Sequence, residues 1–258
     1  TMKNRVTRCA LTRANGVVCV SNYTSEVMHA LGITPQMETV IHNGADANLF
    51  QPGCQSGTMP LLTELGIPPD AFVLLTVGHV SNRKGQEVVV RAMPEILFRY
   101  PNTHYVMAGL PTEREALEKL AGELGVLNNI HFTGRLDGNQ ILSLYQSCDL
   151  FVMTSRHVAG DFEGFGIAVI EAALCEKTAI VSTGSGLEEA VIHGHTGICV
   201  PENDHHQTAA AVIELISDTN KRRQMADQAC LRARKSFTWD VIGGKYNEFA
   251  MRIVEKPQ

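Results

Sequence analysis

Short apolar segments alternate with amphipathic segments through most of this 258-residue chain, and this alternation most limits the folds open to it. From residue 72 onward, six apolar runs are each followed by a segment with helical periodicity. The runs are continuously apolar, as is typical of parallel strands that helices cover on both faces. They lie at residues 72–77, 105–108, 130–133, 150–153, 178–181 and 198–200. Right-handed crossovers between them predict an α/β fold, a doubly wound, parallel six-stranded Rossmann-like domain.

A shorter pattern of the same kind precedes this domain. A strand is predicted at residues 17–20, a helix at 25–31 and a second strand at 39–41. The stretch that follows is rich in Gly, Pro, Asn and Gln, which is typical of a linker. From there to the end of the chain, helices are predicted at residues 86–98, 113–124, 139–147, 166–175, 186–191, 207–216, 220–235 and 239–254.

Composition excludes several classes of protein. Lys and Arg total 22 against 27 Asp and Glu, a formal charge of −5, which disfavours a nucleic-acid partner. The seven cysteines form no Cys-x-x-Cys pair, so neither a disulfide framework nor a structural zinc site is predicted. No apolar run approaches the ~18 residues of a membrane span. These features are typical of a globular protein with reduced thiols in the cytoplasm.

The loop after the first strand of the domain has the residues of a phosphate site. Ligands bind at the carboxyl ends of strands in an open parallel sheet, so loops in this position carry the chemistry. Gly78 and Gly85 allow tight backbone turns, and Arg83 and Lys84 place two cations near a helix N-terminus. The loop is not a P-loop, because the spacing of that motif is absent. The alternative interpretation is a turn with two solvated basic residues.

A second loop combines glycines with carboxylates. Glu163 precedes Gly164, Phe165 and Gly166, which open a helix with free backbone N–H groups. Glu171 lies about 7.5 Å further along that helix, and its side chain leans back toward the N-terminus, where the carboxylate would face the same pocket as Glu163. The alternative is that Glu163 only caps the helix and Glu171 is exposed.

Two further loops give weaker signals. Gly134, Arg135 and Leu136 follow the third strand of the domain and prove little alone. Residues 184–189 nearly match a dinucleotide fingerprint, but Glu189 stands where the last glycine belongs. A structural glycine turn is therefore favoured there over NAD binding. His157, in the loop before the Glu163 segment, lies nearer to the predicted site than His205 and His206, which are expected to be solvated.

Taken together in chain order, these segments resemble a known family. TVGHVSNRKG, HFTGRLDGNQ and EGFGIAVIEAAL closely resemble the C-terminal, donor-binding half of retaining glycosyltransferase family 4 enzymes, which have the two-domain GT-B fold. The most specific element is the Glu-x7-Glu motif of Glu163 and Glu171. The loop at residues 156–162 is similar to that of mannosyltransferases that act on lipid or polysaccharide acceptors.

The resemblance implies a role for each motif. Glu163 and Lys84 would be catalytic, Glu163 facing the reacting sugar and Lys84 the diphosphate. Glu171 would bind the ribose hydroxyls. The residues implied in donor binding are Gly78, His79, Arg83, Lys84, Gly134, Arg135, Leu136, Glu163, Gly164, Phe165, Gly166, Ile167 and Glu171. His79 departs from the family, which commonly has Arg there, so either Arg83 compensates or phosphate affinity is lower.

The resemblance also implies a domain plan and a reaction. Residues 1–42 would be the end of a truncated N-terminal Rossmann domain, 43–70 an interdomain linker, 71–236 the nucleotide-sugar-binding domain, and 237–258 a C-terminal helix returning to the N-terminal domain. The reaction would be retaining transfer of a hexosyl group from a nucleotide-diphosphate sugar, without metal or cofactor. The acceptor would be a glycan or lipid-linked molecule held by the missing N-terminal domain, so this chain alone would bind donor weakly and transfer poorly. Polysaccharide biosynthesis in the cytoplasm, or at the inner face of the membrane as a peripheral protein, is the expected setting.

Three alternatives remain open at this point. Another GT-B enzyme, such as a sugar-nucleotide epimerase or a phosphorylase, would share the fold, and a phosphorylase would need a lysine for pyridoxal phosphate. An NAD-linked oxidoreductase is disfavoured by the imperfect fingerprint at residues 184–189. A non-catalytic nucleotide-sugar-binding subunit would need a partner to supply the acceptor domain.

Overall fold

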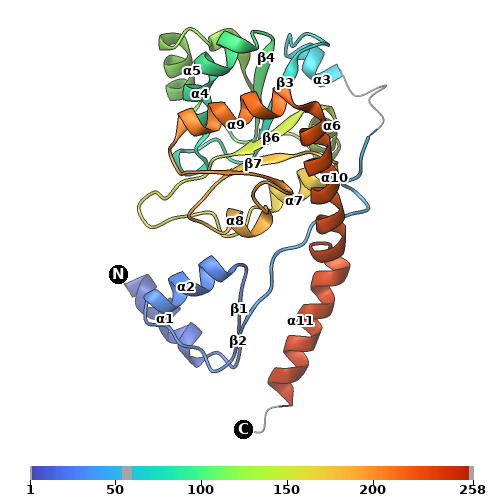
Figure 1. Ribbon diagram of the computed structural model, residues 1–258. Coiled ribbons are helices and arrows are strands. Elements are labelled where there is room, and N and C mark those ends of the chain that lie inside the picture. Colours follow the sequence, from blue (N-terminus) through green and yellow to red (C-terminus); the bar gives the residue numbers. More distant parts are fainter. Residues whose placement is uncertain (1, 54–59, 256–258) are drawn as a thin grey trace.

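The predicted parallel sheet is the centre of the structure. The computed structural model describes residues 2–53 and 60–255. Six parallel strands pair in the order β5-β4-β3-β6-β7-β8, which confirms the doubly wound α/β fold (Figure 1). Their bounds are β3 Phe72–Val77, β4 Thr103–Ala108, β5 Ile130–Gly134, β6 Leu150–Met153, β7 Ala179–Ser182 and β8 Gly197–Val200. The largest difference from prediction is at β4, which begins at Thr103 instead of residue 105.

Helices cover both faces of this sheet, which explains why its strands are apolar throughout. On one face lie α4 (Gln86–Arg99), α5 (Arg114–Glu123) and α9 (His205–Ser217), and on the other α6 (Gly138–Ser147), α7 (Ile167–Leu174) and α10 (Thr219–Ser236). Successive residues of β3 feed the two layers in turn. Leu74 packs with α4, whereas Val73 and Leu75 belong to the cluster of α6 and α7.

A small unit precedes the large domain. It contains α1 (Met2–Arg13), β1 (Val17–Cys19), α2 (Asn22–Ala30) and β2 (Glu38–Val40), and β1 and β2 form a parallel pair. The last helix, α11 (Trp239–Val254), runs alongside this unit, where its Ile242 and Phe249 pack against Ile41 (Figure 1). Sequence reasoning did not predict α1.

The chain passes between the small unit and the large domain twice, and the two passages are hydrogen-bonded to each other. The Ala45 N–H donates to the Phe237 carbonyl at 2.8 Å, and the Trp239 N–H donates to the Ala45 carbonyl at 3.3 Å. After the first passage the chain stays on the large domain, where Phe50, Leu62 and Ile67 are buried in its core. A helical turn, α3 (Pro60–Glu64), lies in this stretch, and residues 54–59 are outside the described part of the chain.

Two local features differ from or qualify the sequence prediction. The helix predicted at residues 186–191 is a single turn, α8 (Leu187–Ala190), because the backbone is already extended at Val191, with φ −124° and ψ 132°. Two short 3-10 turns, η1 (Asn82–Lys84) and η2 (Leu127–Asn129), interrupt the loops.

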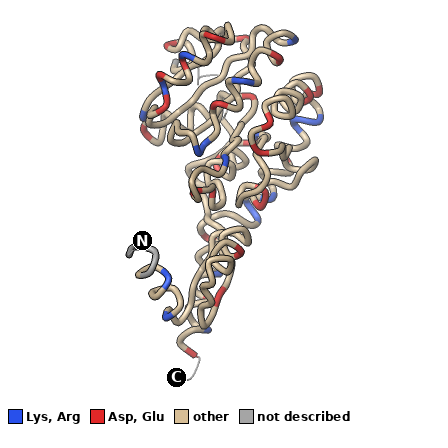
Figure 2. The backbone as a smooth tube through the Cα atoms, turned by 90° about the vertical axis from the view of Figure 1, so that its left-hand side faces the viewer, with Lys and Arg blue, Asp and Glu red and all other residues tan. Residues whose placement is uncertain are grey.

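Among the described helices, none is sufficiently long and apolar to cross a membrane. Acidic and basic residues intermingle over the helices of the large domain (Figure 2).

Candidate functional site

Two of the predicted loops meet at the point where the strand order reverses. β3 and β6 are neighbours in the centre of the sheet, and the chain proceeds from β3 toward one edge and from β6 toward the other. The crevice beyond the carboxyl ends of such a strand pair is the usual ligand site of doubly wound folds. Residues 78–85 follow β3, and residues 154–166 follow β6, so both loops border this crevice.

Glu163 is the centre of a charged cluster formed by these loops. Its Oε2 accepts hydrogen bonds from Lys84 Nζ at 2.5 Å and from Arg83 Nη1 at 2.9 Å, and Ser155 Oγ lies 3.4 Å away. Burial by itself would raise the pKa of Glu163, but the two cations outweigh it, so the pKa lies below its ordinary value. Arg83 also pairs with Asp161 through Nε, at 3.1 Å. The structure therefore brings Arg83, Lys84 and Glu163, which belong to two loops far apart in the sequence, into one charged cluster.

Glycine at position 85 lets the two loops approach each other. Gly85 has a φ of 69°, and a Cβ there would lie 1.9 Å from the Thr154 carbonyl oxygen. Thr154 returns the contact, since its hydroxyl donates to the Gly85 carbonyl at 2.8 Å. On the other side of the loop, the side chain of Lys84 passes over Gly78, where a Cβ would lie 3.5 Å from Lys84 Cε. The loop thus directs Lys84 back across its own backbone toward Glu163.

Gly164 and Gly166 lie directly before α7, which begins at Ile167. Gly166 is the N-cap of α7 with a φ of 92°, and it has no side chain to occupy the first helical N–H groups. Phe165 is buried and packs against the rings of His42 and Phe237, so its backbone is the only part available to a ligand. Ile167, the first residue of the helix, is 37% exposed.

The turn at residues 184–186 supports this loop from behind. The Gly186 N–H donates to the Glu163 carbonyl at 3.1 Å. A Cβ on Gly186 would lie 1.9 Å from the Gly164 carbonyl oxygen, so the backbones are in contact. This contact gives the glycine a packing role, in agreement with the structural interpretation of that motif.

Glu171 has different partners from Glu163. Its Oε2 accepts a hydrogen bond of 2.7 Å from the hydroxyl of Tyr145 on α6. Burial raises the pKa of Glu171, and the Tyr145 hydrogen bond offsets that effect only in part. Tyr145 is fully buried and its pKa is raised as well, first by burial and then by the Glu171 charge. Sequence reasoning missed Tyr145 because a tyrosine in a helix gives no sign of a partner on the next helix.

The remaining predicted residues lie around the edge of the crevice. Gly134, with a φ of 70°, ends β5, and its carbonyl accepts from the Gly109 N–H at 3.0 Å. Arg135 is exposed, whereas Leu136 is half-buried against the core. His79 is exposed and its Nε2 lies 2.5 Å from Thr112 Oγ1, so it interacts with the neighbouring loop after β4.

Side chains of the small unit lie beside these loops, and no local pattern in the sequence had indicated them. Tyr23 contacts the loop before Glu163, with its hydroxyl 2.5 Å from His157 Nε2 and its ring edge-to-face with Phe162 at 5.0 Å. Glu189 of α8 accepts hydrogen bonds from the backbone N–H groups of Asn22 and Tyr23, both at 3.0 Å. The crevice is therefore bounded by the large domain and by the start of α2.

A cation pair beside a carboxylate and a helix N-terminus, at the switch point of a doubly wound sheet, is typical of Rossmann-type domains that bind phosphate-bearing ligands. Among known families, the one described as glycosyl transferases group 1 matches residues 61–232. That match covers most of the large domain, and the chain belongs to this family.

Individual relatives agree with the family. A D-inositol 3-phosphate glycosyltransferase of Corynebacterium diphtheriae is 30% identical over 245 residues, which are 91% of this chain and 56% of that protein. A GDP-mannose-dependent mannosyltransferase of Corynebacterium glutamicum, named for a monoacylated phosphatidylinositol monomannoside, is 27% identical over 235 residues, 90% of this chain and 61% of that protein. This chain thus spans just over half the length of these curated relatives.

Solved structures extend the likeness to three dimensions. The crystal structure of Anabaena HepE in complex with UDP-glucose superposes with a TM-score of 0.87 at 26% sequence identity. The superposition covers 97% of this chain and 68% of HepE. The similarity therefore includes the small unit and α11 as well as the large domain.

Proposed function

We propose that this chain is the donor-binding part of a retaining glycosyltransferase that transfers a hexosyl group from a nucleotide-diphosphate sugar to a glycan or lipid acceptor. The observation that carries the proposal is the convergence of Lys84 and Arg83 on Glu163 at the switch point of the sheet. Two relatives support the donor class, since HepE is described with UDP-glucose and the Corynebacterium glutamicum enzyme is named for GDP-mannose.

The charges of the site match the demands of this reaction. Breaking the bond between sugar and diphosphate builds negative charge on the leaving phosphate, which two fixed cations and a helix N-terminus stabilise. Lys84 and Arg83 supply the cations, and the start of α7 at Gly166 supplies the helix terminus. In our proposal these groups do the work without a metal. The cations pair with Glu163, and in our proposal the diphosphate takes over part of that pairing when the donor binds.

The carboxylates have separate roles in the proposed reaction. Glu163 is ionised at neutral pH, because its pKa is lowered, and it offsets the positive charge that develops at the anomeric carbon. Retention follows from attack on the face that the phosphate leaves, with the leaving phosphate assisting. Tyr145 holds Glu171 Oε2, and we propose that Oε1 accepts a hydrogen bond from the ribose hydroxyls of the donor. Gly134, Arg135 and Leu136 border the nucleobase.

The domain plan is part of the proposal. Residues 1–42 form the end of an N-terminal acceptor domain, residues 43–70 connect it to the nucleotide-sugar-binding domain of residues 71–236, and residues 237–258 return to it. The packing of α11 on the small unit supports this plan. The proposed setting is the cytoplasm, with peripheral attachment at the inner face of the membrane for a lipid-linked acceptor.

Calorimetric titration of the chain with UDP, GDP and ADP, and with UDP-glucose and GDP-mannose, tests the donor proposal. The Lys84→Ala variant should weaken the preferred nucleoside diphosphate about 10- to 100-fold, as expected for a charge-assisted contact of about 1.5–3 kcal/mol, and the matching nucleoside much less. Lys119→Ala is the matched control, since Lys119 is an exposed lysine of α5 paired only weakly with Glu123, at 3.9 Å. If the parent chain binds no nucleoside diphosphate, the proposal is wrong.

A further inference from the structure

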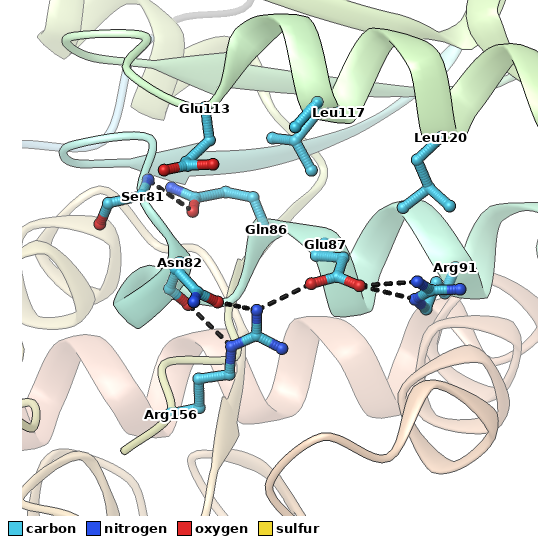
Figure 3. A pocket seen from close by; sticks show the side chains of 10 residues that line it. Ser81, Asn82, Gln86, Glu87, Arg91, Glu113, Leu117, Leu120 and Arg156 are labelled. Atoms are coloured by element: carbon cyan, nitrogen blue, oxygen red, sulfur yellow. Dashed lines mark hydrogen bonds and ion pairs between the residues drawn. The ribbon is translucent and has the colours of Figure 1, made fainter. Parts of the chain in front are cut away.

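Arg156, which the reaction as described above does not use, connects the loop after β6 to the loop after β3. Its backbone N–H donates to the Arg83 carbonyl at 2.7 Å. Its Nε donates to the Asn82 carbonyl at 2.8 Å, and its Nη2 donates to the Asn82 side-chain oxygen. Figure 3 shows the guanidinium between Asn82 and Glu87, at the edge of a cavity of about 290 Å³ between α4 and α5.

The other partners of Arg156 hold its side chain in one place. Nη2 forms an ion pair of 2.7 Å with Glu87 in the first turn of α4, and Nη1 donates to Asn203 at 3.2 Å. The Arg156 hydrogen bond is the largest influence on Glu87 and lowers the pKa of that carboxyl. Only 18% of the Arg156 side chain is exposed. The guanidinium thus bonds to protein partners in three segments, at Asn82, Glu87 and Asn203. It is not directed at the crevice.

Arg156 forms hydrogen bonds with the η1 turn, Asn82–Lys84, which carries both cations of the site. Within the turn itself the backbone bonds are few: the Lys84 N–H donates to the Ser81 carbonyl at an ordinary 3.0 Å, and the Gly85 N–H donates to the Asn82 carbonyl at a longer 3.3 Å. Ser81, the N-cap, makes no side-chain capping bond. A 3-10 turn of this length has little stability of its own, so its geometry depends on outside contacts.

We propose that Arg156 is a positioning residue that orders the Asn82–Lys84 turn, so that Arg83 and Lys84 already point at the diphosphate before it binds. This inference rests on the proposed donor site. A cation that is held in place loses less conformational entropy when its ligand arrives, and affinity for the phosphate part of the ligand rises accordingly. Arg156 acts through the turn and makes no contact with the ligand.

The test is Arg156→Met, which keeps an apolar stem in place and removes the guanidinium. Arg91→Met is the matched control, because Arg91 pairs with the same Glu87 carboxylate, at 2.7 Å through Nη2, from the next turn of α4. Amide hydrogen exchange of the ligand-free chains is measured first. Exchange at Lys84 and Gly85 should rise about tenfold in Arg156→Met and stay at the parent level in Arg91→Met. Equal exchange in all three chains would overturn the ordering role.

Calorimetry with UDP and GDP, and with uridine and guanosine, then tests the consequence for binding. Arg156→Met should bind the preferred diphosphate about tenfold more weakly, with the matching nucleoside unchanged. Because Arg156 acts through Lys84 and Arg83, Arg156→Met should add less in a Lys84→Ala background than in the parent. If the affinity losses of Arg156→Met and Lys84→Ala are fully additive, Arg156 contacts the phosphate directly. If Arg156→Met weakens nucleoside and diphosphate binding equally, the substitution damages the fold in general. Either result refutes the proposal.

The two measurements separate this inference from the proposed function. If the parent binds no nucleoside diphosphate while exchange still rises in Arg156→Met, the donor site is wrong, and the binding role of Arg156 falls with it. If the parent binds diphosphate and Arg156→Met binds it equally well, the donor site stands and only the inference is wrong.

Discussion

Replacing Glu189 by Gln should loosen the contact between the small unit and the large domain. The Glu189 carboxylate lies at the N-terminus of α2, where Oε2 accepts from the Asn22 backbone N–H at 3.0 Å and from Asn22 Nδ2 at 2.7 Å. Oε1 accepts from the Tyr23 N–H at 3.0 Å, and His42 Nε2 lies 2.9 Å from Oε2. One carboxylate of the large domain therefore joins two separate segments of the small unit.

The size of the effect follows from these contacts. A hydrogen bond to a charged group contributes about 1.5–3 kcal/mol, and a carboxylate at a helix N-terminus about 0.3–1 kcal/mol. Glu189 is 19% exposed, so water can replace part of what is lost, and an amide at this position keeps some of the acceptors. We therefore expect Glu189→Gln to cost about 2 kcal/mol of local stability, which corresponds to a roughly 30-fold increase in amide exchange.

Hydrogen exchange followed by mass spectrometry measures this effect at Asn22 and Tyr23. Glu188→Gln is the matched control, since Glu188 holds only the Gly184 N–H of its own loop, at 2.6 Å. Burial alone would raise the pKa of Glu189, but its N–H donors lower it below the ordinary value, so the stabilisation should be present at neutral pH and disappear as the pH falls below about 4.5. Exchange that changes less than about threefold, or equally in both variants, would refute the reasoning.

Three more results are expected. Gly186→Ala should destabilise the chain by about 2–4 kcal/mol in chemical denaturation, because the new Cβ meets the Gly164 carbonyl at 1.9 Å. The control is Gly184→Ala, whose new Cβ meets nothing within 4 Å, although Gly184 also has a positive φ. A loss of stability no larger than that of the control would contradict the clash. Tyr145→Phe should weaken uridine or guanosine about fivefold by releasing Glu171, and unchanged calorimetric affinity would argue against the ribose role. His131 lies 2.9 Å from His104, and burial lowers its pKa to about 4, so the unfolded chain binds more protons below pH 6.5. The full pKa shift would lower the free energy of unfolding by about 2.4 kcal/mol between pH 7 and pH 4.5, and because the His131 side chain is only half-buried we expect a fall of about 1–2 kcal/mol. His131→Gln should remove most of that pH dependence in denaturation midpoints.

The sequence was sufficient to predict the fold of the large domain, and it singled out the loops that form the candidate site. Continuous apolar runs identify buried parallel strands, and chain order with right-handed crossovers leaves few topologies for six of them. Once the strand order is known, the residues just after β3 and β6 must meet at the switch point. Arg83, Lys84 and Glu163 lie in those two loops, so local patterns identify these residues and the strand order brings them together.

The tertiary structure decided which side chains support these groups. Tyr145 bonds to Glu171 across 26 residues, Arg156 to Asn82 across 74, and Glu189 to Asn22 across 167. These partners lie on different helices and loops, and their distances depend on how the helices pack over the sheet, which periodicity does not encode. Local patterns determine which segments become strands and helices and which loops face the crevice. The packing of those segments alone decides which polar groups are close enough to hold the loops after β3 and β6 in place.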